Sequence, residues 1–158
     1  MHTIKRADSK NLDFQLLIQQ LDKDLAIKNG TENDFFAQYN KTDLIKHVII
    51  AYENDKALGC GAIKEYEEGI VEIKRMFVCE NKRGNGIATI ILNELQSWAA
   101  ELGYKRCILE TGAKMIEAVN LYKKNDFKVI SNYGQYADIE TSICFEKEIF
   151  PKNLQPKK

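Results

Sequence analysis

A strand-like run that leads through a short link into a glycine loop and a helix constrains the fold of this chain most strongly. The run Val71 to Val78 has the pattern of a strand, and the loop Arg83-Gly84-Asn85-Gly86 opens a helical pattern. Two glycines separated by one residue let the backbone turn tightly, and the first amides of the following helix point outward. Because a helix N-terminus favours negative charge, we expect an anion site at this loop, with Lys82 and Arg83 at its rim.

The loop does not fit two other phosphate-binding patterns. A dinucleotide fingerprint needs a third Gly or Ala where this chain has Thr89, and the chain lacks the Gly-Lys-Ser or Gly-Lys-Thr of a P-loop. The run Asn81 to Gly86 instead resembles the pyrophosphate loop of the GNAT superfamily of acetyl-CoA-dependent N-acyltransferases. That loop reads Gln or Arg, two residues, Gly, one residue, then Gly or Ala. A second run, Leu109 to Phe127, is similar to the family's late strand, helix and closing segment. The chain departs from the family pattern at Asn81, Met115, Ile116 and Asp126.

The apolar pattern predicts an α/β domain. Strands are expected at residues 3–7, 47–52, 57–63, 70–78, 105–110, 127–131 and 142–149, with a hairpin turn at Asn54-Asp55 and a bulge or close backbone approach at Gly59 and Gly61. Helices are expected after a cap at Asp8 or Ser9, after residue 31, from Ile87 to Leu102, and around Tyr122. The strand-helix-strand connection predicts that 70–78 and 105–110 are parallel. With the GNAT resemblance, this implies a mixed, mostly antiparallel sheet with a splayed parallel central pair and helices on both faces.

Composition argues against several functional classes. Lys plus Arg and Asp plus Glu number 23 each, so no global field attracts nucleic acid or an anionic membrane. The four cysteines are far apart, which favours buried free thiols over a metal site. The chain has neither a signal-peptide pattern nor an apolar run near the ~20 residues that span a bilayer, so we expect a cytoplasmic protein. Residues 1–150 are expected to form a single domain, followed by a polar tail at 151–158.

The GNAT resemblance implies an N-acetyltransferase that moves the acetyl group of acetyl-CoA to a primary amine, by direct attack in a ternary complex and without a metal. By the same resemblance, backbone groups of Met76 to Val78 hold the pantetheine arm, and an amide near Phe77 or Val78 polarises the thioester carbonyl. The acetyl-CoA-binding residues that it implies are Met76, Phe77, Val78, Asn81, Lys82, Arg83, Gly84, Asn85, Gly86, Ile87 and Ala88.

Acyl transfer also needs a base for the amine and an acid for the departing thiolate. The family's helical Tyr in a Leu-Tyr context lies near the thioester sulfur, so Tyr122 is the predicted acid, while packing on a helix face is the plainer interpretation. Glu72 is the preferred base, although it could instead be a solvent-facing partner of Lys74. Glu110, at the end of the neighbouring strand, and a chain of waters are the alternatives. Neither histidine suits the role, because one is terminal and the other opens a strand.

The loop between the last two strands is the expected place for the acceptor. Aromatic rings and carboxylates suit a cationic amine. The expected substrate-binding residues are Tyr133, Tyr136, Asp138 and Glu110. The loop residues could equally be ordinary turn residues with no contact to the substrate. In that case the acceptor pocket is sought near Phe35 and Tyr39.

Two other functions are compatible with the sequence. Protein N-termini or lysines could be the acceptors in place of a small molecule. A sensor domain that binds CoA without turnover would account for the altered residues Asn81 and Asp126. The sequence leaves open the identity of the amine, the size of the acyl group and the oligomeric state, although the family offers a homodimer as one option.

Overall fold

The computed structural model describes residues 2–37 and 45–150, apart from the side chains of Phe35 and Phe36. Tyr39 and the predicted tail at 151–158 lie outside the described residues. The chain divides into two compact units, one built from residues 1–64 and 73–95 and the other from residues 65–72 and 96–158. The strands are hydrogen-bonded in the order β1-β2-β3-β4-β5-β7-β6.

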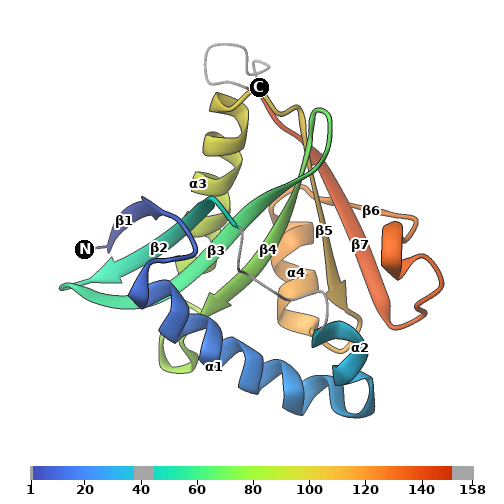
Figure 1. The fold of residues 1–158 in the computed structure, drawn as a ribbon, viewed down its shortest axis with the longest axis horizontal. Helices are drawn as coiled ribbons and strands as arrows, with labels where there is room; N and C mark the ends of the chain where they lie inside the picture. Colours follow the sequence, from blue (N-terminus) through green and yellow to red (C-terminus); the bar gives the residue numbers. More distant parts are fainter. Residues whose placement is uncertain (1, 38–44, 151–158) are drawn as a thin grey trace. The chain divides into compact units, whose positions relative to one another are not determined.

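The first unit combines antiparallel strands with a long helix (Figure 1). It holds β1 (His2–Ala7), α1 (Leu12–Asn29), η1 (Gly30–Glu32), α2 (Asn33–Ala37), β2 (His47–Glu53), most of β3 (Lys56–Glu67) and of β4 (Ile70–Val78), η2 (Glu80–Lys82), and α3 (Ile87–Glu101) up to residue 95. β2 pairs antiparallel with both β1 and β3. The predicted β2–β3 hairpin is confirmed: Asn54 and Asp55 have φ of 50° and 67°, the positive values that a type I′ turn requires.

The start of α1 differs from the prediction. Asn11, and not Asp8 or Ser9, caps the helix, because its side-chain oxygen accepts a hydrogen bond from the Phe14 amide at 3.0 Å. Asp8 accepts one from the Lys10 amide at 2.9 Å and so closes a turn ahead of the helix. An Asn caps a helix as well as Asp or Ser does, so all three positions carried the same signal in the sequence.

Helices cover both faces of the strands in the first unit. α1 packs on one face, in a core formed by Phe14, Leu17, Ile18, Leu21, Ile45, Val48, Ile50, Cys60, Ala62 and Phe77. Gly59 and Gly61 alternate with that set and lie under α3: a Cβ on Gly61 would be 2.8 Å from Leu95 Cδ1, and one on Gly59 would be 2.8 Å from the Phe77 carbonyl oxygen. The predicted close backbone approach is confirmed at Gly59, whereas side chains come close to Gly61; the β2–β3 register also shifts beside Gly59.

The second unit contains the parallel strand pair. It holds the ends of β3 and α3, the start of β4, β5 (Arg106–Gly112), α4 (Ile116–Lys124), β6 (Lys128–Ile130), η3 (Gly134–Tyr136) and β7 (Ser142–Glu148). β4 runs parallel to β5, with Glu72 opposite Ile108, and β7 pairs antiparallel with β5 and β6. The mixed, mostly antiparallel sheet is therefore confirmed. The strand predicted at 127–131 is shorter than expected, and Leu102 lies beyond α3 with 44% of its surface exposed, not on its apolar stripe.

The end of α4 explains one departure from the GNAT pattern. Asp126 has φ of 70°, in the left-handed region where the family has Gly. Its amide donates to the Lys123 carbonyl at 3.2 Å, and the Phe127 amide donates to the Tyr122 carbonyl at 3.0 Å. These two bonds form a Schellman motif with Asp126 at the left-handed position. Asp tolerates that conformation, so the turn after α4 is kept without the glycine.

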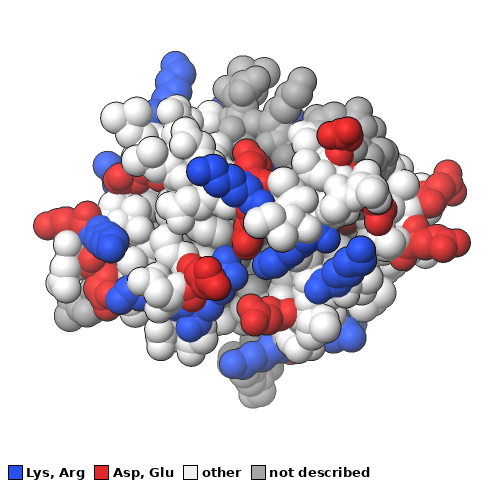
Figure 2. All heavy atoms as spheres, turned by 90° about the horizontal axis from the view of Figure 1, so that it is seen from below, with Lys and Arg blue, Asp and Glu red and all other residues white. Residues whose placement is uncertain are grey.

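Within the described residues, no helix is long and apolar enough to cross a membrane. On the face drawn in Figure 2, basic and acidic side chains are intermixed. Neither sign dominates that face, which agrees with the equal totals of basic and acidic residues.

Candidate functional site

The loop between β4 and α3, in the first unit, combines two left-handed glycines with a helix start. Gly84 and Gly86 have φ of 84° and 78°. A Cβ built on either one meets no heavy atom within 4 Å, so the space beside the loop is open. The Ile90 amide donates to the Gly86 carbonyl at 3.1 Å, and the three preceding amides have no carbonyl within the helix to pair with. The geometry fits a phosphate group.

The two basic residues of this loop are bound to acidic partners in the same unit. Lys82 Nζ lies 3.1 Å from Glu53 Oε2. Arg83 donates from Nε to the Val78 carbonyl at 2.8 Å, and its Nη2 lies 3.2 Å from Asp24 Oδ2. These contacts fix the loop against β4, β2 and α1. They also offset part of the positive charge that the sequence predicts at the rim.

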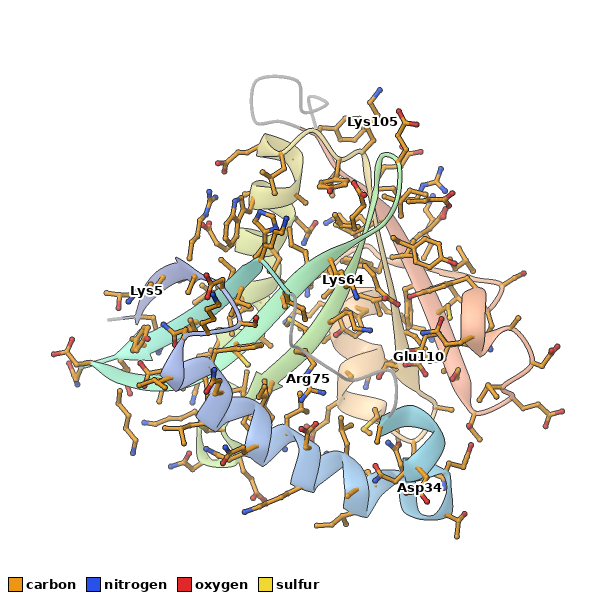
Figure 3. All side chains as sticks on the ribbon, viewed as in Figure 1. Lys5, Asp34, Lys64, Arg75, Lys105 and Glu110 are labelled. Carbon is orange, nitrogen blue, oxygen red and sulfur yellow. The ribbon has the colours of Figure 1, made fainter. Side chains whose placement is uncertain are left out.

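The sequence did not reveal the role of Arg75. This residue is buried and has φ of 60°, a left-handed conformation inside a strand. Its Nη2 lies 2.6 Å from Asp22 Oδ1 and 3.5 Å from the Ile18 carbonyl oxygen, both on α1 (Figure 3). The contact joins α1 to β4 at the residue of the strand that has the left-handed conformation. The available signal was an arginine in the alternating register of Val71, Ile73 and Phe77, where an apolar residue is expected.

Glu72, in the second unit, lies among tyrosines and not in solvent. It is only 8% exposed, and its Oε2 accepts a hydrogen bond from the Tyr133 hydroxyl at 2.5 Å. The Tyr133 ring makes edge-to-face contacts with Tyr66 and Tyr136, at centroid distances of 5.2 and 5.9 Å. Burial and the charge of Glu72 raise the pKa of Tyr133, so its hydroxyl keeps the proton that it donates. The alternative of a solvent-facing Glu72 is therefore wrong.

Glu110 belongs to the same group of side chains. Its Oε2 accepts a hydrogen bond at 2.6 Å from Ser142, a buried residue of β7 that the sequence did not indicate. Figure 3 shows Glu110 on β5. Burial, followed by the charges of Glu110 and Glu72, raises the pKa of Tyr136. Both carboxylates thus act on one tyrosine hydroxyl, and the unit brings together three of the four predicted substrate-binding residues and the predicted base.

Tyr122 is 5% exposed and packs with its ring centroid 5.7 Å from those of both Phe127 and Phe145. The ring is thus part of the core, as the plainer interpretation holds. Burial, and then the charge of Glu110, raises the pKa of the Tyr122 hydroxyl, which stays protonated at neutral pH. Its part in proton transfer stays a prediction.

The loop after β6 is held closed by side-chain hydrogen bonds. Asn132 Nδ2 donates to the carbonyls of Ile139 and Ser142, at 2.9 and 3.1 Å, and so ties the two ends of the loop together. Tyr136 is buried, whereas Asp138 is exposed. Contact between this loop and an amine stays a prediction.

The thiols of Cys60, Cys107 and Cys144 do not offer a nucleophile. All four cysteines are free. Burial raises the pKa of Cys60 and of Cys107 to about 12 and that of Cys144 to about 11, so these thiols stay protonated at neutral pH. Across residues 2–37 and 45–150, no group of three or more His, Cys, Asp or Glu side chains is placed to hold a metal ion.

Comparison with known proteins identifies the family. The sequence profile of the acetyltransferase (GNAT) family matches residues 15–127. The chain belongs to the GNAT acetyltransferase family. Its matched residues include the glycine loop, Glu72, Glu110 and Tyr122. The loop that carries Tyr133 lies outside the match, so its role rests on the contacts of this GNAT protein itself.

Relatives of this GNAT protein share most of its length. The IAA acetyltransferase of Azospirillum brasilense is 30% identical over 84% of this chain and 88% of its own. The crystal structure of a Klebsiella pneumoniae protein assigned to the acyl-CoA N-acyltransferases superposes with a TM-score of 0.79, over 95% of this chain and 99% of its own. The two sequences are 25% identical. A GNAT acetyltransferase from Elizabethkingia anophelis, solved with acetyl-CoA bound, is 19% identical, with a TM-score of 0.68 over 94% of this chain and 98% of its own.

Proposed function

We propose that this GNAT acetyltransferase moves the acetyl group of acetyl-CoA to a primary amine of a small molecule, by direct attack in a ternary complex in the cytoplasm. The observation that carries the proposal is the helix start at Gly84 and Gly86, where open space meets amides that have no carbonyl partner within the helix. A relative with the same fold was solved with acetyl-CoA bound, which supports the choice of anion.

The residues of the first unit fit this co-substrate, which supplies an acyl group activated as a thioester. Asn81 to Ala88 are proposed to hold its pyrophosphate, and Met76 to Val78 its pantetheine arm. Successive residues of a strand direct their backbone groups to opposite edges. The Cys79 amide donates to the Leu58 carbonyl of β3 at 2.8 Å, so the Val78 amide faces the edge away from β3. Of the two amides predicted to polarise the thioester carbonyl, Val78 is therefore preferred to Phe77.

Glu72 is the proposed base, because a buried carboxylate beside tyrosines can take a proton from a cationic amine. Tyr122 is the proposed proton donor to the leaving sulfur. Its raised pKa makes it a weak acid toward a thiolate, whose conjugate acid has a pKa of roughly 8.5. Tyr122 is thus expected to stabilise the thiolate mainly by a hydrogen bond, which gives a modest rate effect.

The rings of Tyr133 and Tyr136, with the carboxylates of Glu110 and Asp138, are proposed to favour a cationic amine. Asp138 would meet the distant part of the acceptor, since it is the one exposed member of this set. A contact of that kind contributes equally to the ground state and the transition state, so its loss is expected in KM and not in kcat.

An amine panel followed through release of the free CoA thiol tests the proposed function. The panel contains diamines, amino acids, aminoglycosides and peptides with a free N-terminus. The proposal expects amine-dependent thiol release with at least one small amine, and a raised KM for that amine in Asp138→Asn. Release with peptides alone would show a protein acetyltransferase. Tight acetyl-CoA binding without release for any amine would show a sensor domain.

A further inference from the structure

The hydroxyl of Tyr133 is bound to the proposed base, which suggests a role other than contact with the acceptor. We propose that Tyr133 is a positioning residue: its hydroxyl holds the Glu72 carboxylate in one orientation. The inference rests on the proposed function, because it takes Glu72 to be the base. It differs from the acceptor role predicted for Tyr133, which depends on the ring and not on the hydroxyl.

The contacts of the second unit leave Tyr133 little freedom. Its hydroxyl lies 2.5 Å from Glu72 Oε2, and its ring packs edge-to-face with Tyr66 on one side and Tyr136 on the other. The next residue, Gly134, has φ of 52°, and a Cβ there would lie 3.1 Å from the Tyr66 hydroxyl. The two hydrogen bonds from Asn132 close the loop behind it. A side chain fixed in this way directs its hydroxyl at one carboxylate oxygen.

The groups around Glu72 determine the direction of the effect. They include Tyr133 and Tyr136 of the loop, Cys144 of β7 and Glu110 of β5. The tyrosines and the thiol have raised pKa values and stay neutral, so Glu110 is the one charged group among these four. Tyr133→Phe removes a hydrogen bond made to the carboxylate of Glu72, and a hydrogen bond of that kind stabilises the charged form of its acceptor. Removing the hydroxyl therefore makes the base easier to protonate.

Glu110 has a matching donor in Ser142, at 2.6 Å. Each of the two candidate bases thus accepts a hydrogen bond from one neutral hydroxyl of the same unit. Tyr133→Phe removes the donor to Glu72, and Ser142→Ala removes the donor to Glu110. The two variants therefore report separately on the two carboxylates.

The test is the pH dependence of kcat/KM for an accepted amine. In Tyr133→Phe the acidic limb of this pH profile is expected to move to higher pH by roughly one unit, because a hydrogen bond to a charged group is among the stronger hydrogen bonds. The affinity for acetyl-CoA should stay unchanged, and Ser142→Ala should leave the limb in place. Tyr104→Phe is the matched control, since it removes a 2.8 Å tyrosine–carboxylate bond, to Glu65, that involves neither candidate base.

A second readout does not need turnover. The Tyr133 hydroxyl proton should give a downfield, slowly exchanging NMR signal that is lost in Tyr133→Phe and shifts in Glu72→Gln, while Tyr104→Phe leaves it in place. The inference is overturned if that signal is absent from the wild type, if Tyr133→Phe moves the acidic limb no more than Tyr104→Phe does, or if Ser142→Ala is the variant that moves it. If the signal is present and no amine is acetylated, the hydrogen bond is upheld, and the proposed function and the positioning role both fall.

Discussion

A single negative charge added at the glycine loop should weaken phosphate binding and leave the fold unchanged. Gly84 has φ of 84°, and a Cβ added to it meets no heavy atom within 4 Å. Asp and Asn both tolerate the left-handed region and have nearly the same shape, so Gly84→Asp and Gly84→Asn carry the same backbone strain. They differ by one negative charge. The pair therefore isolates the electrostatic part of acetyl-CoA binding.

The size of the difference follows from Coulomb's law. Two unit charges about 4 Å apart repel by about 1 kcal/mol in water and by about 4 kcal/mol at an effective dielectric constant of 20. Since each 1.4 kcal/mol corresponds to about tenfold in affinity, Gly84→Asp should bind acetyl-CoA about fivefold to several hundredfold more weakly than Gly84→Asn. Salt screens exposed charges, so the ratio should shrink as ionic strength rises.

Isothermal titration calorimetry of both variants, at low and at high salt, measures the ratio directly. Urea unfolding of each variant checks that the fold is retained and that the two are equally stable. If Gly84→Asp and Gly84→Asn bound acetyl-CoA with equal affinity at low salt, no phosphate would lie beside residue 84. The assignment of the loop would then be wrong, whatever the activity of the wild type.

Two further predictions concern Tyr122 and Asp24. Tyr122→Phe keeps the ring contacts with Phe127 and Phe145, so acetyl-CoA affinity should stay unchanged in binding assays. The loss of a hydrogen bond to the charged thiolate should lower kcat by about tenfold to a hundredfold, and a kcat within twofold of wild type would remove Tyr122 from the mechanism. Burial raises the pKa of Asp24, but hydrogen bonds and charges of Lys28 and Arg83 outweigh it and leave the pKa below its usual value. The stability that these pairs contribute is present above the unfolded pKa of about 3.9 and is lost as pH falls through the lower folded value. Urea unfolding between about pH 6 and pH 3 should therefore show a steeper loss in the wild type than in Asp24→Asn, and equal slopes would exclude this contribution.

Local patterns predicted the parts of this fold that depend on neighbours in sequence. The hairpin at Asn54-Asp55 follows from residues that tolerate positive φ, and the small residues Gly59 and Gly61 indicated the close approach of α3. The glycine loop was predicted by the same logic. In each case the backbone conformation demands a particular residue type, so the sequence carries the information directly.

Features set by partners far away in sequence were predicted poorly. The hydrogen bond between Glu72 and Tyr133 joins residues 61 positions apart, and neither side chain shows in the sequence which partner it has. Arg75 was missed for the same reason, since its partners Ile18 and Asp22 lie on a helix more than 50 residues earlier. Asn11 shows a different limit: it caps α1 in place of the predicted Asp8 or Ser9, and local chemistry does not choose among these three residue types.

The central claim is direct transfer of the acetyl group from acetyl-CoA to an amine in one ternary complex. The most direct measurement is the initial rate of thiol release while the concentrations of acetyl-CoA and of an accepted amine are both varied. Direct attack predicts double-reciprocal lines that intersect, in keeping with the raised pKa values of Cys60, Cys107 and Cys144, which leave those thiols protonated. Parallel lines would show an acetyl-enzyme intermediate and would contradict the account.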